Sequence, residues 1–397
     1  MSAAEAGEIC FRVFGRTDVG QVREHNEDNF LVGNLSTGGR GLMESDRDQR
    51  VGARGTTLAV CDGMGGAAAG EVASQLAVDI IYEKLSEGAP LKDHDDLARR
   101  LVHAVEEAGV RIFNEARADR TRRGMGTTAT VAALMDARLF VAQVGDSRAY
   151  VLRDGKLVQI SRDQSLVNQL IEAGQLTEEE AETFEHNNII LQALGTAESV
   201  QVDLTYVDLR QGDTLMLCSD GLSGMIRADE IREVLSSHED PLAACKELTD
   251  RANGAGGHDN ITVIVAKFDK GLPKLKSDDV LAYQKYALPD VPSDEFSRTE
   301  AVSADDVDTP ISDEAMRESR RLRVAHTMVG ASNPLMQALE AQPTGRPANP
   351  ASLRPGNYSA DDEPVQIPTT GLPPAAVGFM VLGAMIVVAV AGFLLLR

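Results

Sequence analysis

Carboxylates stand at the ends of several apolar segments of this chain. The segment TTLAVCD ends in Asp62, TLMLCSD ends in Asp220, and Asp259 opens the segment that continues as NITVIVAKF. A carboxylate at the end of a buried strand costs free energy unless a partner offsets its charge, and converging carboxylates also repel one another. A divalent cation offsets both costs, and a ligand set of oxygen atoms without Cys or His favours the hard ions Mg²⁺ or Mn²⁺. We therefore expect a metal centre where these strands end.

A polar segment near the N-terminus, TDVGQVREHNED (residues 17–28), extends the acidic set. It supplies Asp18, Arg23, Glu27 and Asp28. Four or more acidic motifs of this kind, together with one arginine, are much less common by chance than any single motif.

Each Asp-Gly pair on its own is more typical of a hairpin turn, and Asp154-Gly155 is assigned to one. Asp62-Gly63 differs because a glycine-rich loop and a helical pattern follow it, in DGMGGAAAGEVASQL. Such a loop also cradles phosphate through backbone N–H groups, so a nucleotide site is an alternative. The sequence has no GxxxxGKS/T or GxGxxG motif to support that alternative.

Strand patterns recur over residues 10–268, and hairpin signals such as Asp154-Gly155 between them indicate antiparallel sheets. The expected strands are CFRVFGR, TTLAVCD, TATVAALM, RLFVAQVG, RAYVLRDG, KLVQISRD, VQVDLTYVDL, DTLMLCSD and NITVIVAKF. The expected helices cover about 70–85, 95–118, 228–237 and 241–253. Several strands are apolar on both faces, so both sides of the sheets must be covered. We expect an α+β fold, a four-layer α-β-β-α sandwich with two central antiparallel sheets.

The charge balance narrows the classes of partner. Among 397 residues, 61 Asp and Glu face 39 Lys and Arg, for a net charge of −22. Such a chain is a poor candidate for nucleic-acid binding, because attraction to phosphates needs the opposite sign. Its four cysteines are widely spaced without a CxxC pair, which argues against a disulfide framework or a thiolate zinc site and fits a reducing compartment.

Taken together, the motifs resemble those of the metal-dependent protein phosphatases of type 2C, the PPM family, in their bacterial-type form. The matching stretches occur in family order, and they are TDVGQVREHNED, VCDGMGGAAAGEVAS, GMGTTAT, VGDSRAY, SLVNQLIEAGQLT, CSDGL and GHDNIT. The resemblance implies a catalytic domain over residues 1–269 that hydrolyses phosphoserine and phosphothreonine in proteins. It also implies Mn²⁺ or Mg²⁺ as cofactor, with two ions or three.

The resemblance assigns a role to each site residue. The implied metal ligands are Glu27, Asp28, Asp62, the carbonyl of Gly63, Asp146, Asp220 and Asp259. Asp62 would bridge two ions, Glu27 would act through bound water, and Asp146 with Asp220 would form a third, weaker site. Arg23 would hold the substrate phosphate, since its planar donor fork suits bidentate contact. Arg23 and Asp62 are thus the implied catalytic residues.

The implied pair of ions would clamp and deprotonate a bridging water, which attacks phosphorus in line. Uncatalysed phosphate-monoester hydrolysis is among the slowest reactions known, so most of the acceleration must come from electrostatic preorganisation. The alternative is a catalytically weakened pseudophosphatase that serves as an interaction or sensing module.

Three positions depart from the family in lacking a histidine. Ala67 stands in the glycine-rich loop, Met64 follows Asp62-Gly63, and Gln164 stands in a DQS that the family usually has as DHS. These departures slightly favour the pseudophosphatase, whereas the complete aspartate set and Arg23 argue against it. The segment 165–194 corresponds to the family's variable flap, which is expected to select substrates.

The C-terminal third differs in composition. Residues 270–374 are rich in Pro, Ser, Ala and Asp, which predicts a disordered linker. Residues 375–396, AAVGFMVLGAMIVVAVAGFLLL, carry no charge, and as a helix they would span roughly 33 Å, close to a bilayer core of roughly 30 Å. They predict a single transmembrane helix.

The N-terminal sequence MSAAEAGEIC lacks the bases and the apolar run of a signal peptide. We therefore expect a cytoplasmic catalytic domain that the C-terminal helix tethers to the cell membrane. Its expected partners are phosphorylated proteins, among them Ser/Thr protein kinases and their substrates.

Overall fold

A computed structural model describes residues 8–41, 47–65, 69–181, 184, 188–276 and 279–288. The predicted transmembrane helix and most of the predicted linker lie outside these ranges. Among the helices within them, none has the length and apolar character needed to span a bilayer.

The first sheet has six antiparallel strands in the order β10-β9-β12-β13-β1-β4. Its strands are β1 (Cys10–Asp18), β4 (Asp48–Arg50), β9 (Arg148–Arg153), β10 (Lys156–Gln159), β12 (Thr214–Cys218) and β13 (Ile261–Lys270). The β9–β10 hairpin turns at Asp154 and Gly155, whose φ angles of 48° and 71° are both positive, as a type I′ turn requires. The turn predicted at Asp154-Gly155 is confirmed.

The second sheet follows the order β14-β11-β8-β7-β5-β2-β3, with β6 paired to β5 as its eighth strand. Its strands are β2 (Asp28–Asn34), β3 (Gly39–Arg40), β5 (Thr56–Met64), β6 (Gly126–Thr127), β7 (Ala129–Met135), β8 (Arg138–Val144), β11 (Asp203–Asp208) and β14 (Gln284–Lys285). Pairing is antiparallel here as well. The expected strands all form, whereas β2 is a central strand that the sequence analysis did not identify.

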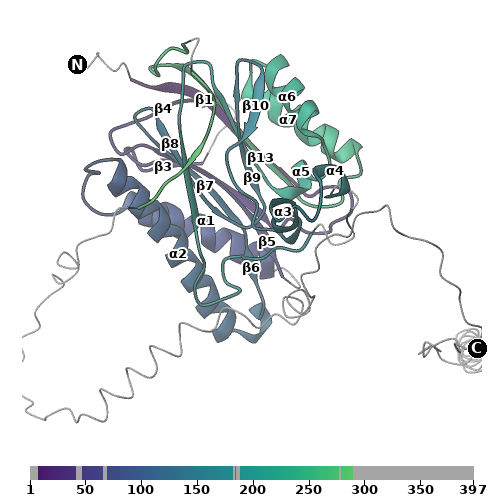
Figure 1. The fold of residues 1–397 in the computed structure, drawn as a ribbon. Helices are drawn as coiled ribbons and strands as arrows, with labels where there is room; N and C mark the ends of the chain where they lie inside the picture. Colours follow the sequence, from purple (N-terminus) through teal and green to yellow (C-terminus); the bar gives the residue numbers. More distant parts are fainter. Residues whose placement is uncertain are drawn as a thin grey trace, which may run out of the picture. The chain divides into compact units, whose positions relative to one another are not determined.

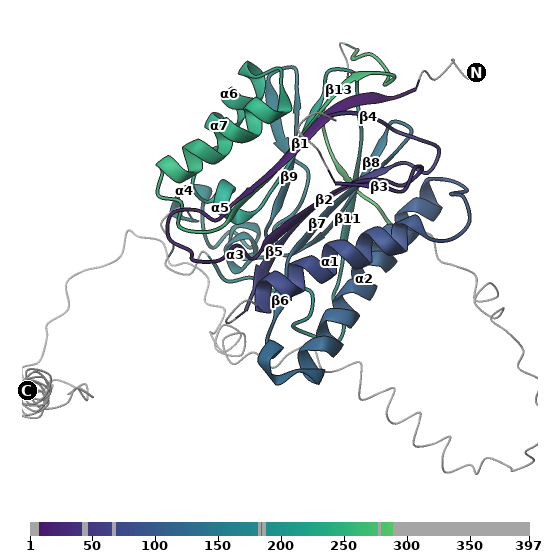
Figure 2. The same ribbon diagram turned by 180° about the vertical axis from the view of Figure 1, so that it is seen from behind.

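Helices cover the outer face of each sheet, as Figures 1 and 2 show from opposite sides. The long helices are α1 (Ala69–Ser86) and α2 (His94–Ala118) on the second sheet, and α6 (Ala228–Ser237) and α7 (Pro241–Gly254) on the first. Short helices are η1 (Arg120–Arg122), α3 (Leu166–Glu172), α4 (Glu178–Ala181) and α5 (Asp220–Ser223). The long helices lie within one residue of their predicted ends.

The two-residue repeat of a strand explains how one segment serves two apolar layers. In β5, Leu58 and Val60 enter the core between the sheets, and Ala59 and Cys61 enter the core beneath α1 and α2. A third core lies between the first sheet and the helices α6 and α7. The structure thus confirms the predicted α+β sandwich with two antiparallel sheets and its four layers.

Part of the predicted linker packs on the fold. In residues 279–288, Leu281 is buried, β14 pairs with the edge strand β11, and Arg210 forms an ion pair with Asp279 at 2.9 Å. The ring of Tyr286 packs edge-on against Phe140 with 5.0 Å between centroids. The folded unit therefore extends past residue 269, where the sequence analysis placed the end of the catalytic domain.

Candidate active site

Four of the predicted metal ligands lie at the ends of four strands, two in each sheet. Asp28 begins β2 and lies directly opposite Asp62 near the end of β5 in the antiparallel register. Asp220 follows β12 and opens α5, and Asp259 precedes β13, the strand that pairs with β12. These four carboxylates are far apart in the sequence. They come together because the fold brings the ends of β2 and β5 to the ends of β12 and β13.

A hydrogen bond joins the two sheets at the acidic residues. The hydroxyl of Ser219, at the end of β12, donates to Oδ2 of Asp28 at 2.8 Å, although 191 residues separate the two. Asp220 also lies close enough to Asp62 for its charge to raise the pKa of Asp62. The acidic set predicted from the sequence thus forms one cluster across the two sheets.

Burial dominates the electrostatics of this cluster. The pKa of Asp28 is raised to about 7, mainly by burial and also by the charges of Asp220 and Asp259, while hydrogen bonds from Thr262 and Ser219 oppose the shift. Burial also raises the pKa of Asp62 well above its usual value, with additional contributions from Asp28 and Asp220. The pKa of Asp220 is raised by burial as well. Each shift reports that negative charge at this position lacks compensation.

Three carboxylate oxygens of the cluster are buried without any hydrogen-bond partner, namely Oδ1 of Asp28, Asp146 and Asp220. A buried, unpaired carboxylate oxygen is costly, and an oxygen-only donor set suits a hard divalent cation. Among the described residues, no three His, Cys, Asp or Glu side chains are already drawn together as a compact ligand shell. The fit to Mn²⁺ or Mg²⁺ therefore rests on the unpartnered oxygens and on the chemistry of the donor set.

Glu27 and Gly63 meet at the start of α1. The N–H of Gly63 donates to the carbonyl of Glu27 at 3.1 Å, and a Cβ on Gly63 would lie 2.3 Å from the carbonyl oxygen of Gly70. Only glycine fits at position 63, which leaves its backbone accessible for a close approach. Burial raises the pKa of Glu27, while Arg23 and a backbone hydrogen bond from Gly70 oppose the shift.

Arg23, the residue predicted to hold a phosphate, lies at the edge of the cluster. Its Nη2 donates to Oδ2 of Asp259 at 2.7 Å, and its side chain keeps 52% of its surface exposed. The guanidinium is therefore fixed beside a predicted metal ligand and remains open to solvent, as a ligand for an incoming anion must be.

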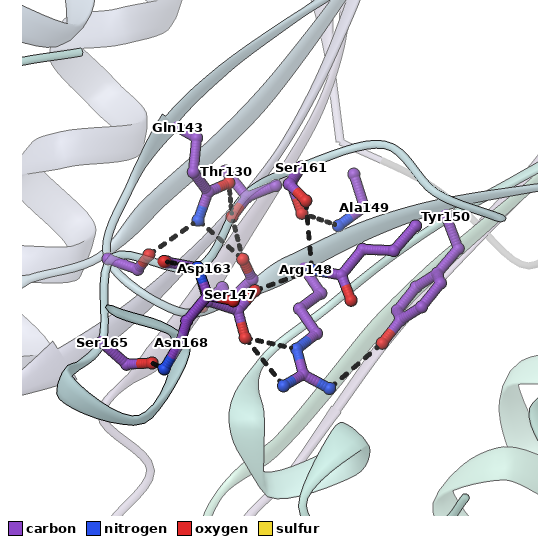
Figure 3. Close-up of polar contacts among 12 residues, drawn as sticks. Thr130, Gln143, Ser147, Arg148, Ala149, Tyr150, Ser161, Asp163, Ser165 and Asn168 are labelled. Atoms are coloured by element: carbon purple, nitrogen blue, oxygen red, sulfur yellow. Dashed lines mark hydrogen bonds and ion pairs between the residues drawn. The ribbon is translucent and has the colours of Figure 1, made fainter. Parts of the chain in front are cut away.

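Asp146 lies in the turn between β8 and β9, and the next residue, Ser147, belongs to the polar network drawn in Figure 3. The pKa of Asp146 is raised to about 7, first by burial and then by the charges of Asp220 and Asp163. In the network, Nε of Arg148 donates to Oδ2 of Asp163 at 2.7 Å, and Nδ2 of Asn168 on α3 donates to the carbonyl of Asp163 at 2.9 Å. The network thus joins the strand that follows Asp146 to the first helix of the flap.

Gln164 occupies the position where a histidine was expected, and it clamps the turn before Asp146. Its Oε1 accepts from the N–H of Gly145 at 3.0 Å, and its own N–H donates to the carbonyl of Gly145 at 2.8 Å. Met64 is half-buried at the end of β5, and Ala67 lies outside the described residues. The amide of Gln164 therefore has a structural role that does not require an imidazole.

Sequence reasoning missed the side chains that hold the ligands in place. Thr128 accepts from the N–H of Asp62 at 2.9 Å, and Asn260 accepts from the N–H of Glu27 at 2.8 Å while donating to the carbonyls of Val19 and His25. Asn260 had a signal in the sequence, because it directly follows Asp259. Thr128 lay in the matching stretch GMGTTAT, but nothing in that stretch indicated its contact with Asp62.

Three comparisons place this arrangement among known proteins. Residues 38–258 match the protein phosphatase 2C family model. The serine/threonine phosphatase stp of Listeria monocytogenes is 35% identical over 254 residues, which cover 64% of this chain and 94% of that protein. The crystal structure of the serine/threonine phosphatase PstP/Ppp of Mycobacterium tuberculosis is 34% identical with a TM-score of 0.56, and the match covers 66% of this chain and 100% of that one. A structure of the PstP catalytic domain in complex with two manganese ions is also 34% identical, with a TM-score of 0.55 and the same coverage.

Proposed function

This chain belongs to the protein phosphatase 2C family and is a serine/threonine protein phosphatase of the bacterial type, and we propose that it hydrolyses phosphoserine and phosphothreonine monoesters in proteins with two or three bound Mn²⁺ or Mg²⁺ ions. The observation that carries the proposal is the set of three buried carboxylate oxygens, on Asp28, Asp146 and Asp220, without a hydrogen-bond partner. These oxygens need a cation, and the related phosphatase structure with two manganese ions indicates which kind.

The residues that would hold the ions are Glu27 through water, Asp28, Asp62, the carbonyl of Gly63, Asp146, Asp220 and Asp259. When bound, the ions would supply a water of lowered pKa and would offset the charge of the phosphoryl oxygens. The chain itself fixes the ligands, since Ser219 holds Asp28 and Thr128 holds the backbone of Asp62. Such fixed positions reduce the reorganisation that the reaction requires.

Arg23 would bind and orient the phosphate. Its ion pair with Asp259 holds the guanidinium at the edge of the acidic cluster. The exposed N–H groups can donate two hydrogen bonds to a phosphoryl group. The guanidinium adds positive charge at the edge of an acidic cluster and so favours the approach of a phosphate dianion.

The chain offers no imidazole at position 64, 67 or 164 to protonate the leaving group. We therefore expect slower hydrolysis of esters with poorer leaving groups, and phenyl phosphate compared with p-nitrophenyl phosphate tests this. If Ala67→His leaves both rates unchanged, the missing imidazole is not the cause.

The test of the proposed function is phosphothreonine-peptide hydrolysis by the full-length protein with Mn²⁺, Mg²⁺ or EDTA. We expect turnover with either ion, and its loss in EDTA and in Asp62→Asn or Asp220→Asn. Asp154→Asn, in the β9–β10 turn, is the matched control and should keep full activity. Turnover that persists in EDTA contradicts the proposal, and ion binding without turnover favours the pseudophosphatase instead.

We further propose that residues 375–396 tether the enzyme to the cell membrane with its catalytic domain in the cytoplasm. A flexible linker of the remaining residues up to 374 would keep the domain within about 50 Å of the membrane on average. Tethering raises the effective concentration of the enzyme toward membrane-bound phosphoproteins, such as Ser/Thr kinases and their substrates. Deletion of residues 375–397 should preserve activity on a soluble phosphopeptide and reduce activity on a membrane-anchored one. Equal loss on both substrates would contradict the tether.

A further inference from the structure

A basic turn follows α2 in this otherwise acidic protein. Residues 117–123, RADRTRR, contain four arginines and one aspartate, whereas the whole chain has a net charge of −22. We refer to this segment as the basic turn. All four of its bases are arginines, and arginine presents the planar fork that matches carboxylate geometry.

The backbone of the basic turn is fixed. Asp119 accepts hydrogen bonds from the N–H and the hydroxyl of Thr121 at 2.8 and 2.7 Å, and it caps the short helix η1. Met125 is fully buried, and its N–H donates to the carbonyl of Arg122 at 3.1 Å. A turn held at both ends displays its side chains from constant positions, so little backbone entropy is lost when a ligand binds.

Two of the four arginines already have partners, and two do not. Arg122 forms ion pairs with Glu115 at 3.2 Å and Asp119 at 3.6 Å, and the guanidinium of Arg117 lies over the ring of Phe113. Arg120 and Arg123 are exposed, and neither forms an ion pair with any residue in the part of the chain that the structure describes. These two guanidinium groups are available to an external anion.

The basic turn adjoins the candidate active site. Thr127, four residues after Arg123, donates its hydroxyl to the carbonyl of Asp62 at 2.9 Å and exchanges two backbone hydrogen bonds with Leu194 at the end of the flap. Four residues of chain span at most about 14 Å. Figure 1 shows β6, which contains Thr127, next to the lower end of α2 and on the same side of the molecule as α3 and α5.

We propose that Arg120 and Arg123 bind acidic side chains of the protein substrate and so determine which phosphosites this enzyme prefers. The inference rests on the proposed phosphatase function and names a substrate class for the same site. Arg123 lies at most about 14 Å along the chain from Thr127, and Thr127 contacts Asp62, so the arginines can meet side chains at most about five residues away along an extended peptide at roughly 3.3 Å each. The preferred substrates are therefore phosphosites with Asp or Glu within about five residues.

The negative charge of the protein explains why the basic turn would matter for substrate choice. The acidic domain repels the acidic segments that surround such phosphosites, and the two unpaired guanidinium groups offer these segments a local attraction. Each exposed ion pair contributes modestly, so the preference is graded and depends on salt.

The experiment compares two double variants of the full-length protein. The test variant is Arg120→Ala with Arg123→Ala, and the control is Arg232→Ala with Lys246→Ala, which removes the same charge from exposed positions on α6 and α7. The substrates are p-nitrophenyl phosphate and two phosphothreonine peptides that differ only in Glu or Ala at positions three to five residues from the phosphothreonine. The readout is the ratio of kcat/KM for the acidic peptide to that for the neutral one.

We expect the test variant to lower this ratio about three- to tenfold through KM, at low ionic strength, and to leave p-nitrophenyl phosphate hydrolysis unchanged. The difference in this ratio between the test variant and the unaltered protein should vanish at about 0.5 M salt. Arg120→Gln with Arg123→Gln repeats the test if the alanine variant unfolds early.

An unchanged ratio, or an equal drop in the control, overturns the inference while hydrolysis continues. Loss of binding to phosphatidylserine vesicles with an unchanged ratio would assign the basic turn to a membrane and also overturn it. Absence of hydrolysis of all three substrates by the unaltered protein instead rejects the proposed function.

Discussion

Arg23 donates a hydrogen bond to Asp259 at 2.7 Å, so the side chain expected to hold the substrate phosphate is paired with one expected to hold a metal ion. The side chains keep 52% and 38% of their surfaces exposed. Because an exposed ion pair is worth about 0–1 kcal/mol, either partner can turn to a stronger ligand at small cost. The pair orients both residues before ion and substrate arrive.

Replacement of Arg23 tests its role in phosphate binding. Arg23→Ala should lower kcat/KM for a phosphothreonine peptide about 10- to 100-fold, since charge-assisted hydrogen bonds contribute roughly 1.5–3 kcal/mol. Arg23→Lys should fall in between, because it keeps the charge and loses the fork. The midpoint of thermal unfolding should stay within a few degrees. Arg50→Ala, on the edge strand β4, serves as the control, and an Arg23→Ala enzyme with unaltered kcat/KM would exclude phosphate binding by this residue.

Ser219 tests whether the acidic cluster depends on its supporting hydrogen bonds. Its buried hydroxyl donates to Asp28 and accepts from the N–H of Thr262 at 3.0 Å. Ser219→Ala leaves both groups unsatisfied and should reduce the free energy of unfolding by about 1–3 kcal/mol, with weaker Mn²⁺ binding. Ser236→Ala, on the exposed face of α6, should have almost no effect on either quantity. Equal behaviour of the two variants in denaturant titrations and calorimetry would contradict this role.

The raised pKa values predict how stability depends on pH without metal. Burial raises the pKa of Asp28 and Asp146 to about 7, against about 3.9 in an unfolded chain. A carboxyl group with a higher pKa in the folded state stabilises the fold at pH below about 4, and this contribution is lost as the pH rises through about 7. We therefore expect the unfolding temperature in EDTA to fall between pH 5 and pH 8.

Mn²⁺ should reverse this trend, because its ligands must be deprotonated. The rise in unfolding temperature on addition of Mn²⁺ should be larger at pH 8 than at pH 5. Asp28→Asn should flatten the pH dependence in EDTA. A shift by Mn²⁺ of equal size at both pH values would show that the buried carboxylates are not its ligands.

Residues 279–288 provide a test of the domain boundary. A chain that ends at residue 269 loses the burial of Leu281, the packing of Tyr286 and the Arg210–Asp279 ion pair. Together these contributions are worth about 2–5 kcal/mol. Chains that end at 269 and at 290 should therefore differ clearly in denaturant midpoint. Leu281→Ala in the longer chain should lower the midpoint by part of that difference. Identical midpoints would mean that the segment adds no stability.

The sequence predicted the parts of the site that follow from local pattern. Apolar strands that end in Asp62 and Asp220 identified two of the carboxylates, and the helices behind them followed from the 3.6-residue repeat. The strand β2 was missed because DNFLVGN has only three consecutive apolar residues, yet it places Asp28 opposite Asp62. The strand β14 was missed because it consists of only two exposed residues, in a segment that was assigned to the linker.

The remaining features depend on contacts between distant parts of the chain. Ser219 reaches Asp28 across 191 positions and Asn260 supports Glu27 across 233, so neither contact has a local signature. Arg120 and Arg123 carry no local signal of a role, and it is the pairing of β5 with β6 that places Thr127, four residues after Arg123, beside Gly63. Local sequence patterns thus identified chemical groups, whereas strand register determined which of them act together.

The central claim is that the converging carboxylates hold divalent ions, and titration calorimetry of the full-length protein with Mn²⁺ tests it most directly. We predict at least two binding events for the unaltered protein, the loss of binding in Asp62→Asn, and unchanged binding in Asp154→Asn. A folded protein that takes up no Mn²⁺, or an Asp62→Asn variant that binds it equally well, would contradict the claim.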